Sequence, residues 1–419
     1  MFFLKSTKTS IGSNISSILS IINRKKGESQ VGILAVLVNL WFLIGPSSAF
    51  AIVDPLAVPN NKFGIHIISP VPDEASPAAS LVNSSGGDWG YVTLVIGRKD
   101  MVHDKWQEFF NDLSRRHLIP IVRLATEPGS SPAGGWKRPD LGEAQAWTDF
   151  LDSLTWPTKN RYVVIFNEPN QGQEWGGTVD PADYAKTLDK FITTLKNKNQ
   201  DFFILNAGLD ASAPSEQPFF EDEAFFLRQM NEAIPGIFDK LDGWVSHSYP
   251  NPGFTGLPDA IGRATVRNYD WELSELKSCC LSKTLPVFIT ETGWKHAEGL
   301  VFNPNLPSAD TVGEYYKKAF EEAWSDSRIV TVTPFLLTYQ EAIFDHFSFR
   351  KISNDGENGF YPQFDVVKDL PKPAGKPVIE LKKAEPKIDL DLTSHKYLTE
   401  IKSSSSNFLS ALFNLIHWN

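Results

Sequence analysis

The feature that most constrains the fold of this chain is an alternation of short apolar runs with amphipathic patterns, which starts near residue 63. The apolar runs are rich in β-branched residues and fit strands, while the segments between them carry helical stripes. The eight strand-like runs are residues 63–68, 91–96, 119–124, 162–166, 202–206, 243–246, 287–290 and 330–337. Runs without an alternating polar face predict a parallel sheet that helices cover on both sides. Eight such units predict a closed (β/α)8 barrel, the TIM-barrel fold, over residues 60–370.

The helical patterns support this interpretation. Residues 106–117 place large apolar side chains on one stripe, and residues 181–198 begin with Asp180 as a cap and Pro181 at the first helical position. A third pattern covers 310–325, and only 363–370 could form a helix that closes the eighth unit. A doubly wound open sheet is the alternative, but no Gly-x-Gly-x-x-Gly turn follows the first strand.

The first 51 residues have the order of an export signal. A basic region precedes a 15-residue apolar stretch from Val31 to Gly45, and the small-x-small sequence Ala49-Phe50-Ala51 follows. The stretch is shorter than the roughly 20 residues of a membrane-spanning helix. We therefore predict a signal peptide, with an uncleaved membrane anchor as the alternative. In both cases the rest of the chain would be secreted or held on the outer face of the cell membrane.

The composition of the chain limits the molecules it can bind and the ways in which it can be cross-linked. The formal net charge of −10 argues against nucleic acid as a partner and is compatible with a neutral sugar polymer. The two cysteines, Cys279 and Cys280, are adjacent and poorly placed to bridge each other, so no disulfide scaffold is expected. Residues 371–419 are rich in Pro, Lys and Ser and predict a linker and a tail.

Two glutamates follow apolar runs at corresponding places. Glu168 comes after the fourth run in Asn167-Glu168-Pro169, and Glu291 comes after the seventh run in Glu291-Thr292-Gly293. The carboxyl ends of barrel strands carry the catalytic residues of this fold. Two facing carboxyl groups are what glycosidic cleavage needs, because one protonates the leaving oxygen and the other attacks or stabilises the anomeric carbon.

These motifs resemble clan A of the glycoside hydrolases, a (β/α)8 superfamily. The likeness covers roughly residues 63–370 and includes His247-Ser248-Tyr249 after the sixth strand. The resemblance implies a retaining mechanism with Glu168 as acid/base and Glu291 as nucleophile. It also implies that Tyr249 orients the nucleophile and that His247 contacts the ring or the sugar.

Further residues follow from the same resemblance. Asn167 would hydrogen-bond the substrate 2-hydroxyl, and Trp294 would lie close to the sugar. Many clan members place an arginine near the end of the second strand. Here Arg98 follows that strand, and Arg123, inside the third run, is better placed.

Aromatic residues near the predicted strand ends could stack on sugar rings, and we expect two or three of the six to face the substrate. They are Trp89, Trp136, Trp175, Tyr249, Tyr339 and Phe344. Trp136 lies in a glycine-rich loop and is the best candidate for an exposed platform. Glu127 and Asp210, two other acids at strand ends, are expected to support the site or to be solvated. No zinc-ligand spacing is present, and residues 354–359 lack a full calcium-ligand pattern.

The sequence thus predicts a glycosidase that works as a monomer on an extracellular poly- or oligosaccharide, without cofactor or metal. A non-catalytic carbohydrate-binding protein of the cell surface and a transglycosylase are the alternatives. The sugar and its linkage are not determined, because specificity lies in the loops rather than in the fold.

Overall fold

The computed structural model describes residues 52–129, 135–352 and 359–379. The predicted signal or anchor (1–51) and the tail from residue 380 onward lie outside these residues, as does most of the predicted turn at 354–359. Within the described part of the chain, no helix combines the length and the apolar character that a membrane span requires.

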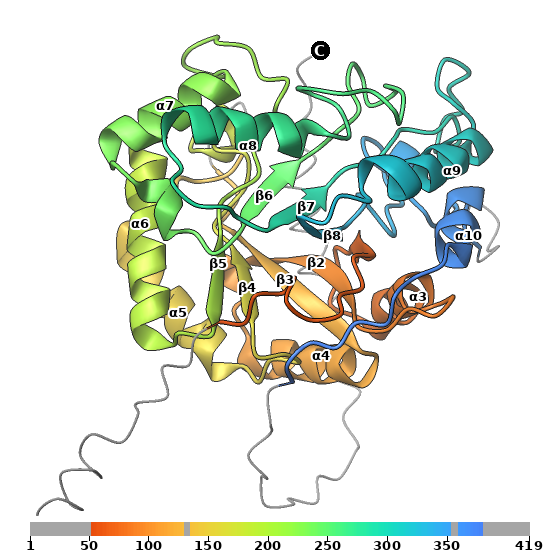
Figure 1. Cartoon of the computed structure of the whole chain (residues 1–419), viewed down its shortest axis with the longest axis horizontal. Helices are drawn as coiled ribbons and strands as arrows, with labels where there is room; N and C mark the ends of the chain where they lie inside the picture. Colours follow the sequence, from red (N-terminus) through yellow and green to blue (C-terminus); the bar gives the residue numbers. More distant parts are fainter. Residues whose placement is uncertain (1–51, 130–134, 353–358, 380–419) are drawn as a thin grey trace, which may run out of the picture. The chain divides into compact units, whose positions relative to one another are not determined.

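The core of the fold is a ring of eight parallel strands (Figure 1). The strands are β1 Gly64–His66, β2 Gly90–Gly97, β3 Leu118–Ala125, β4 Arg161–Val164, β5 Phe202–Leu205, β6 Trp244–His247, β7 Val287–Glu291 and β8 Ile329–Val332. β1 to β5 pair in sequence order, and so do β6 to β8. Parallel bridges Leu205–Gly243 and Phe63–Val332 join the two sheets into a closed barrel. The prediction of a TIM barrel is therefore confirmed.

Helices lie outside the ring of strands and cover it (Figure 1). The α-helices are α3 Pro72–Val82, α4 His103–Arg115, α5 Ala144–Ser153, α6 Pro181–Lys198, α7 Glu223–Ala233, α8 Asn268–Cys279, α9 Ala309–Lys318 and α10 Pro362–Asp369. The shorter turns are η1 Arg98–Asp100, η2 Leu141–Glu143, η3 Gly172–Glu174, η4 Ile237–Lys240, the π-helical η5 Ala319–Ala323 and η6 Asp345–Phe347. Helix α6 begins as predicted, because the Asp180 side chain accepts a hydrogen bond from the backbone N–H of Asp183.

Alternate residues of each strand point into the barrel or toward the helices, and both sets are buried. The interior is filled by large side chains from successive strands, among them Tyr91, Ile121, Tyr162, Phe203, Val245 and Phe288. A second and larger apolar cluster lies between the strands and the helices. Each fully buried side chain of this size contributes roughly 1.5–3 kcal/mol. The interior is thus a packed core, which leaves the ends of the strands for the site.

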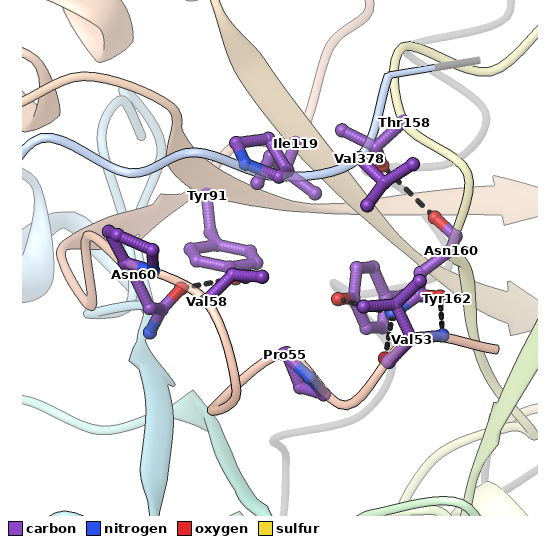
Figure 2. Close-up of a pocket in the computed structure, with 12 residues that line it drawn as sticks. Val53, Pro55, Val58, Asn60, Tyr91, Ile119, Thr158, Asn160, Tyr162 and Val378 are labelled. Carbon is purple, nitrogen blue, oxygen red and sulfur yellow. Dashed lines mark hydrogen bonds between the residues drawn. The ribbon is translucent and has the colours of Figure 1, made fainter.

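The N-terminal end of the barrel is closed by two segments from opposite ends of the described chain (Figure 2). Residues 53–60 are held by the Asn160 side chain, which bonds both backbone groups of Val53, and by Tyr91, whose hydroxyl donates to Asn60. Val378 and its neighbours lie against the same end, where the Val378 carbonyl accepts from the N–H of Lys159. The cavity between them offers only ≈ 20 Å³ to the centres of water molecules, which is enough for about one water.

The segment predicted as a linker is extended and, over its described residues 371–379, packs on the barrel. Its backbone forms bridges from Ala374 to Asp88 and from Ile379 to Thr158. The ammonium group of Lys372 donates to the carbonyl oxygens of Val367, Lys368 and Leu370 at the end of α10. Cationic side chains bind the free carbonyls of a helix C-terminus in this way.

The expectation that the two cysteines would not bridge each other was wrong. Cys279 and Cys280 form a disulfide with each other at the end of α8. The bond joins neighbouring residues and closes no long loop, so it cross-links no distant parts of the chain.

Candidate active site

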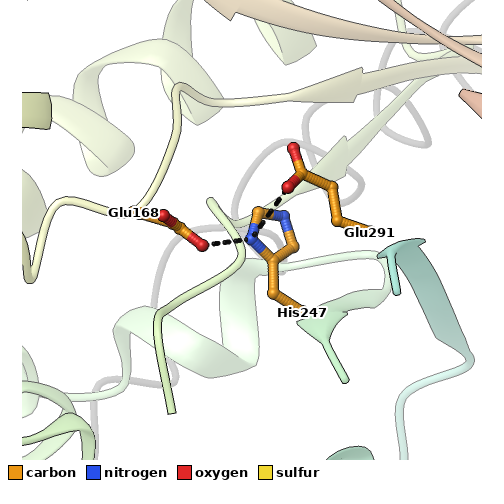
Figure 3. Close-up of side chains that lie close together, drawn as sticks. All are labelled: Glu168, His247 and Glu291. Carbon is orange, nitrogen blue, oxygen red and sulfur yellow. Dashed lines mark hydrogen bonds and ion pairs between the residues drawn. The ribbon is translucent and has the colours of Figure 1, made fainter. Parts of the chain in front are cut away.

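The two predicted glutamates meet at the C-terminal ends of the strands. Glu291 is the last residue of β7, and Glu168 lies four residues beyond the end of β4. Their carboxyl groups approach the His247 ring so closely that one polar atom from each of the three side chains lies within 4.8 Å of the other two (Figure 3). Glu291 is 8 % exposed, while Glu168 is more accessible.

His247 lies between the two carboxyl groups (Figure 3). Its Nδ1 is 2.8 Å from Oε1 of Glu168 and 3.8 Å from Oε2 of Glu291. Burial by itself would lower the pKa of His247, but the negative charge of Glu291 and the hydrogen bond and charge of Glu168 raise it. The two carboxyl groups thus stabilise the charged form of the imidazole, although its side chain is only 1 % exposed.

Tyr249 and Arg123 complete the surroundings of Glu291. The Tyr249 hydroxyl donates to Oε2 of Glu291 at 3.1 Å. Burial would raise the pKa of Glu291, but His247 and Arg123 lower it, together with this hydrogen bond. Arg123 lies near the C-terminal end of β3, between Val95 of β2 and Val164 of β4. Arg123, which the sequence favoured over Arg98, thus lies close enough to Glu291 to lower its pKa.

Asn167 pairs with an acid that the sequence analysis did not single out. Its side chain is hydrogen-bonded to the carboxyl group of Glu174, at the end of η3. Burial, followed by the charge of Glu168, raises the pKa of Glu174 to about 8, although Arg123 opposes the shift. A protonated Glu174 adds no charge beside the two glutamates at neutral pH. The sequence signal for Glu174 was its position a few residues after Asn167 in the loop that follows β4.

Gln171 connects Glu168 to Asp210, one of the two other acids at strand ends. Its Nε2 donates to Oε2 of Glu168 at 2.8 Å and to Oδ2 of Asp210 at 3.3 Å. Burial and the charge of Glu168 raise the pKa of Asp210 to about 6. Asp210 therefore supports the site. Glu127, by contrast, pairs with Lys137 at 2.9 Å.

His66 is a second residue that the sequence analysis missed. It is the last residue of β1, and its Nε2 lies 3.9 Å from Oε1 of Glu291. The sequence predicted a strand over residues 63–68, which placed His66 inside the run and hid its position at the end of β1. All strand ends of a closed parallel barrel meet at one face.

The predicted aromatic contacts are largely packed away from solvent. Trp294, 1 % exposed, lies against Tyr316 and Trp324, and its Nε1 donates to the Gly256 carbonyl. Trp136 is 8 % exposed and packs against Val95 and Ala125, so the expectation of an exposed platform was wrong. Trp136 is tied to the loop after β4, because its backbone N–H donates to the Gln173 carbonyl.

The remaining aromatic candidates have packing roles as well. Tyr339 is 2 % exposed and packs edge-on against Phe344. Trp175 is fully buried and donates to Asp183. Trp89 precedes β2, at the opposite end of the barrel, and stacks on His117. Of the six candidates, Tyr249 is the one that contacts Glu168 or Glu291 within the described residues.

Two carboxyl groups and an imidazole could also hold a metal ion, and the polar atoms of Glu168, His247 and Glu291 are close enough for this. The 2.8 Å contact between His247 and Glu168 accounts for the spacing without an ion. Among the described histidines outside the site, His103 and His117 lie beside Asp104 and Asp88. A site without metal or cofactor stays a prediction.

No protein-family model matches this chain, and no curated protein matches it. Solved structures do match. A monomeric β-xylosidase from Caulobacter crescentus is 13% identical, covers 74% of this chain and 68% of its own, and superposes with a TM-score of 0.52. An endo-β-1,4-glucanase from Xanthomonas axonopodis pv. citri is 13% identical over 73% of this chain and 97% of its own, with a TM-score of 0.47. A β-glucosidase from Trichoderma harzianum is 10% identical over 77% and 98%, also with a TM-score of 0.47.

The chain shares the barrel fold of this β-xylosidase. The resemblance predicted from the sequence motifs is thereby confirmed at the level of the barrel. At 13% identity the likeness concerns the fold alone, and the assignment of activity depends on the side chains at the ends of the strands.

Proposed function

We propose that this chain is a retaining glycoside hydrolase that cleaves O-glycosidic bonds of a poly- or oligosaccharide outside the cell. The observation that carries the proposal is the approach of Glu168 and Glu291, with a carboxylate oxygen of each within 4.8 Å of the other. This separation agrees with the roughly 5–5.5 Å between the two carboxyl groups of retaining enzymes, and not with the roughly 6.5–9.5 Å of inverting enzymes.

In the first step Glu291 attacks the anomeric carbon while Glu168 gives its proton to the glycosidic oxygen. The bond between that carbon and oxygen breaks, the leaving sugar departs as an alcohol, and a glycosyl ester forms on Glu291. His247 and Arg123 suit this role of Glu291, because both hold its pKa below the usual range and so keep it as a carboxylate. Tyr249 fixes one of its oxygens by a hydrogen bond.

In the second step water attacks the ester, and Glu168 takes the proton that the water loses. The sugar leaves with its original anomeric configuration, and both glutamates return to their starting states. The contact of 2.8 Å between Nδ1 of His247 and Oε1 of Glu168 holds an imidazole beside the proposed acid/base. This arrangement suits a residue that acts first as acid and then as base.

Replacing each glutamate by alanine tests the proposal. The substrates are 4-nitrophenyl β-xyloside, β-glucoside, β-mannoside and β-galactoside, with the matching oligosaccharides. We expect Glu291→Ala to lower kcat by roughly 10³-fold or more and Glu168→Ala by roughly 10²- to 10⁴-fold. Azide or formate should restore activity to Glu291→Ala and give a product of inverted configuration, since the small anion replaces the missing carboxylate.

Glu127→Gln is the matched control, because Glu127 also follows a strand but binds Lys137 and Lys99. It should keep wild-type rates. Wild-type rates in both Ala variants would refute the assignment. Product analysis at high acceptor concentration separates hydrolysis from glycosyl transfer, and binding of the oligosaccharides without turnover would instead indicate a carbohydrate-binding protein.

Export rests on residues 1–51, which lie outside the described residues. We propose a secreted protein or one held on the outer face of the cell membrane. Fractionation of cells that express the whole chain, with N-terminal sequencing of the mature product, tests this. A mature protein that begins near Ile52 supports cleavage.

A further inference from the structure

His66 is a buried imidazole whose polar atoms are unused. His66 is 1 % exposed, and within the described part of the chain neither nitrogen of its ring has a hydrogen-bond partner. The Phe335 ring packs edge-on against it, with centroids 5.2 Å apart. The 3.9 Å from Nε2 to Oε1 of Glu291 is too long for a direct hydrogen bond. Because a buried polar group normally finds a partner, this ring is suited to a group that arrives with the ligand.

The charge state of His66 differs from that of His247 across the same glutamate. Burial lowers the pKa of His66 to about 3, and the positive charges of Arg123 and His247 lower it further against the opposing effect of Glu291. The ring is therefore neutral at neutral pH and offers one N–H donor and one nitrogen acceptor. At neutral pH the uncharged ring therefore makes no ion pair with Glu291. It can serve as a donor and acceptor toward an uncharged hydroxyl group.

We propose that His66 is a substrate-binding residue that hydrogen-bonds a hydroxyl group of the sugar held over Glu291. This inference rests on the proposed glycosidase function and adds a residue from β1 to its sugar site. A gap of 3.9 Å between Nε2 and Oε1 admits a hydroxyl oxygen at about 2.8 Å from each atom. The imidazole N–H donates to that oxygen, and the hydroxyl hydrogen is donated to the carboxylate. The substrate is then a glycoside with a free hydroxyl at this position.

A cycle of variants and deoxy substrates tests the inference. The variants are His66→Gln, which keeps a donor and an acceptor, and His66→Phe, which keeps neither. The probes are the 4-nitrophenyl β-glycoside that the wild type hydrolyses best and its 2-deoxy, 3-deoxy and 4-deoxy analogues. Because removal of a bound hydroxyl leaves buried polar groups unpaired, we expect the wild type to lose about 100-fold or more in kcat/KM on the relevant analogue.

The expected pattern is specific to one hydroxyl. His66→Phe should lose about 10- to 100-fold on the parent glycoside and little more on that analogue. His66→Gln should retain more activity than His66→Phe, and the acid limb of its pH profile should stay in place because the native ring is already neutral. His296→Gln is the matched control: this buried ring bonds the Ser348 carbonyl, and its loss should leave all deoxy ratios unchanged.

Several results would overturn the inference. Equal losses of His66→Phe on the parent and on every deoxy analogue would show a structural role only. Wild-type rates in His66→Phe, or a shifted acid limb in His66→Gln, would also contradict it. If the wild type hydrolyses the glycosides but the expected losses on the deoxy analogues are missing, the role of His66 is refuted and the glycosidase function is not. A wild type that hydrolyses no glycoside refutes both proposals.

Discussion

Glu291 keeps a carboxylate form in a buried position because neighbouring groups compensate for the loss of water around it. His247 and Arg123 supply positive charge, and Tyr249 supplies a hydrogen bond. The proposed nucleophile must be ionised to attack, so these neighbours would extend its working range toward lower pH. None of the three is near Glu291 in the sequence, and each comes from a different part of the chain.

Replacing His247 should change the pH profile. His247→Gln removes a positive charge 3.8 Å from Glu291, so the pKa of Glu291 should rise. The acid limb of kcat/KM, which reports ionisation of Glu291 if it is the proposed nucleophile, should then move to higher pH. We also expect kcat to fall by roughly 10²-fold, because Glu168 loses its partner for proton exchange. Steady-state rates on a 4-nitrophenyl glycoside between pH 3 and pH 9 measure both effects.

His117→Gln is the control for this experiment, since His117 lies at the opposite end of the barrel beside Asp88 and Trp89. It should keep the wild-type profile. An acid limb that stays in place in His247→Gln would mean that the imidazole charge does not set the ionisation of Glu291.

The turn after β4 fixes the position of Glu168, the proposed acid/base. Phe166 and Glu168 both have positive φ, at 69° and 32°, which non-glycine residues rarely adopt. Each such residue costs on the order of 1–3 kcal/mol, and strain of this kind collects at functional sites. The turn is held by the next element, because the N–H of Glu168 donates to the Gly208 carbonyl after β5.

Gly208 also makes room for the site, and its replacement should damage activity. A Cβ at residue 208 would overlap the His247 ring, so Gly208→Ala must displace either that ring or the turn that holds Glu168. We expect a loss of at least about 10-fold in kcat and a decrease of about 1–3 kcal/mol in the free energy of unfolding. Kinetics and urea denaturation of the same preparation separate the two effects.

Gly97→Ala is the matched control at the end of β2, where an added Cβ meets no atom within 4 Å. It should leave activity and stability close to wild type. If Gly208→Ala is as active as Gly97→Ala, then contact between residue 208 and His247 does not position the catalytic groups.

For the whole molecule, the barrel separates stability from chemistry. The glutamates lie at the C-terminal ends of the strands, while residues 53–60 and 371–379 close the N-terminal ends. Backbone hydrogen bonds tie the later segment to the barrel, from Gly375 to Asp88 and from Lys376 to Pro59. This division is usual for the fold, in which the N-terminal face serves stability.

Removing the closing segment should therefore affect stability before activity. A chain that ends at residue 370 loses the hydrogen bonds of 371–379, whereas a chain that ends at 379 keeps them. At about 0.5–1.5 kcal/mol for each hydrogen bond, we expect the shorter chain to lose about 3 kcal/mol or more of unfolding free energy. At 25 °C its kcat should stay within about twofold. Equal melting temperatures of the two chains would show that the segment does not stabilise the barrel.

The periodicity of the sequence predicted the eight strands, the barrel and the helix that begins after Asp180, because these depend on local patterns. The contact between Glu168 and Glu291 followed from the same fold, since parallel strands place their carboxyl ends at one face. Burial was harder to predict. Trp136 and Trp294 carry the residue type of a sugar platform, but neighbouring elements cover both.

The sequence by itself determined where the strands lie and which two acids end them, because both are properties of short segments. Only the tertiary structure decided the surroundings of these acids. His66, Arg123 and His247 come from β1, β3 and β6, and closure of the barrel brings them beside Glu291. Distances between side chains on different strands depend on register and packing of the whole ring, which no local pattern contains. The same closure buries His66 and leaves it uncharged.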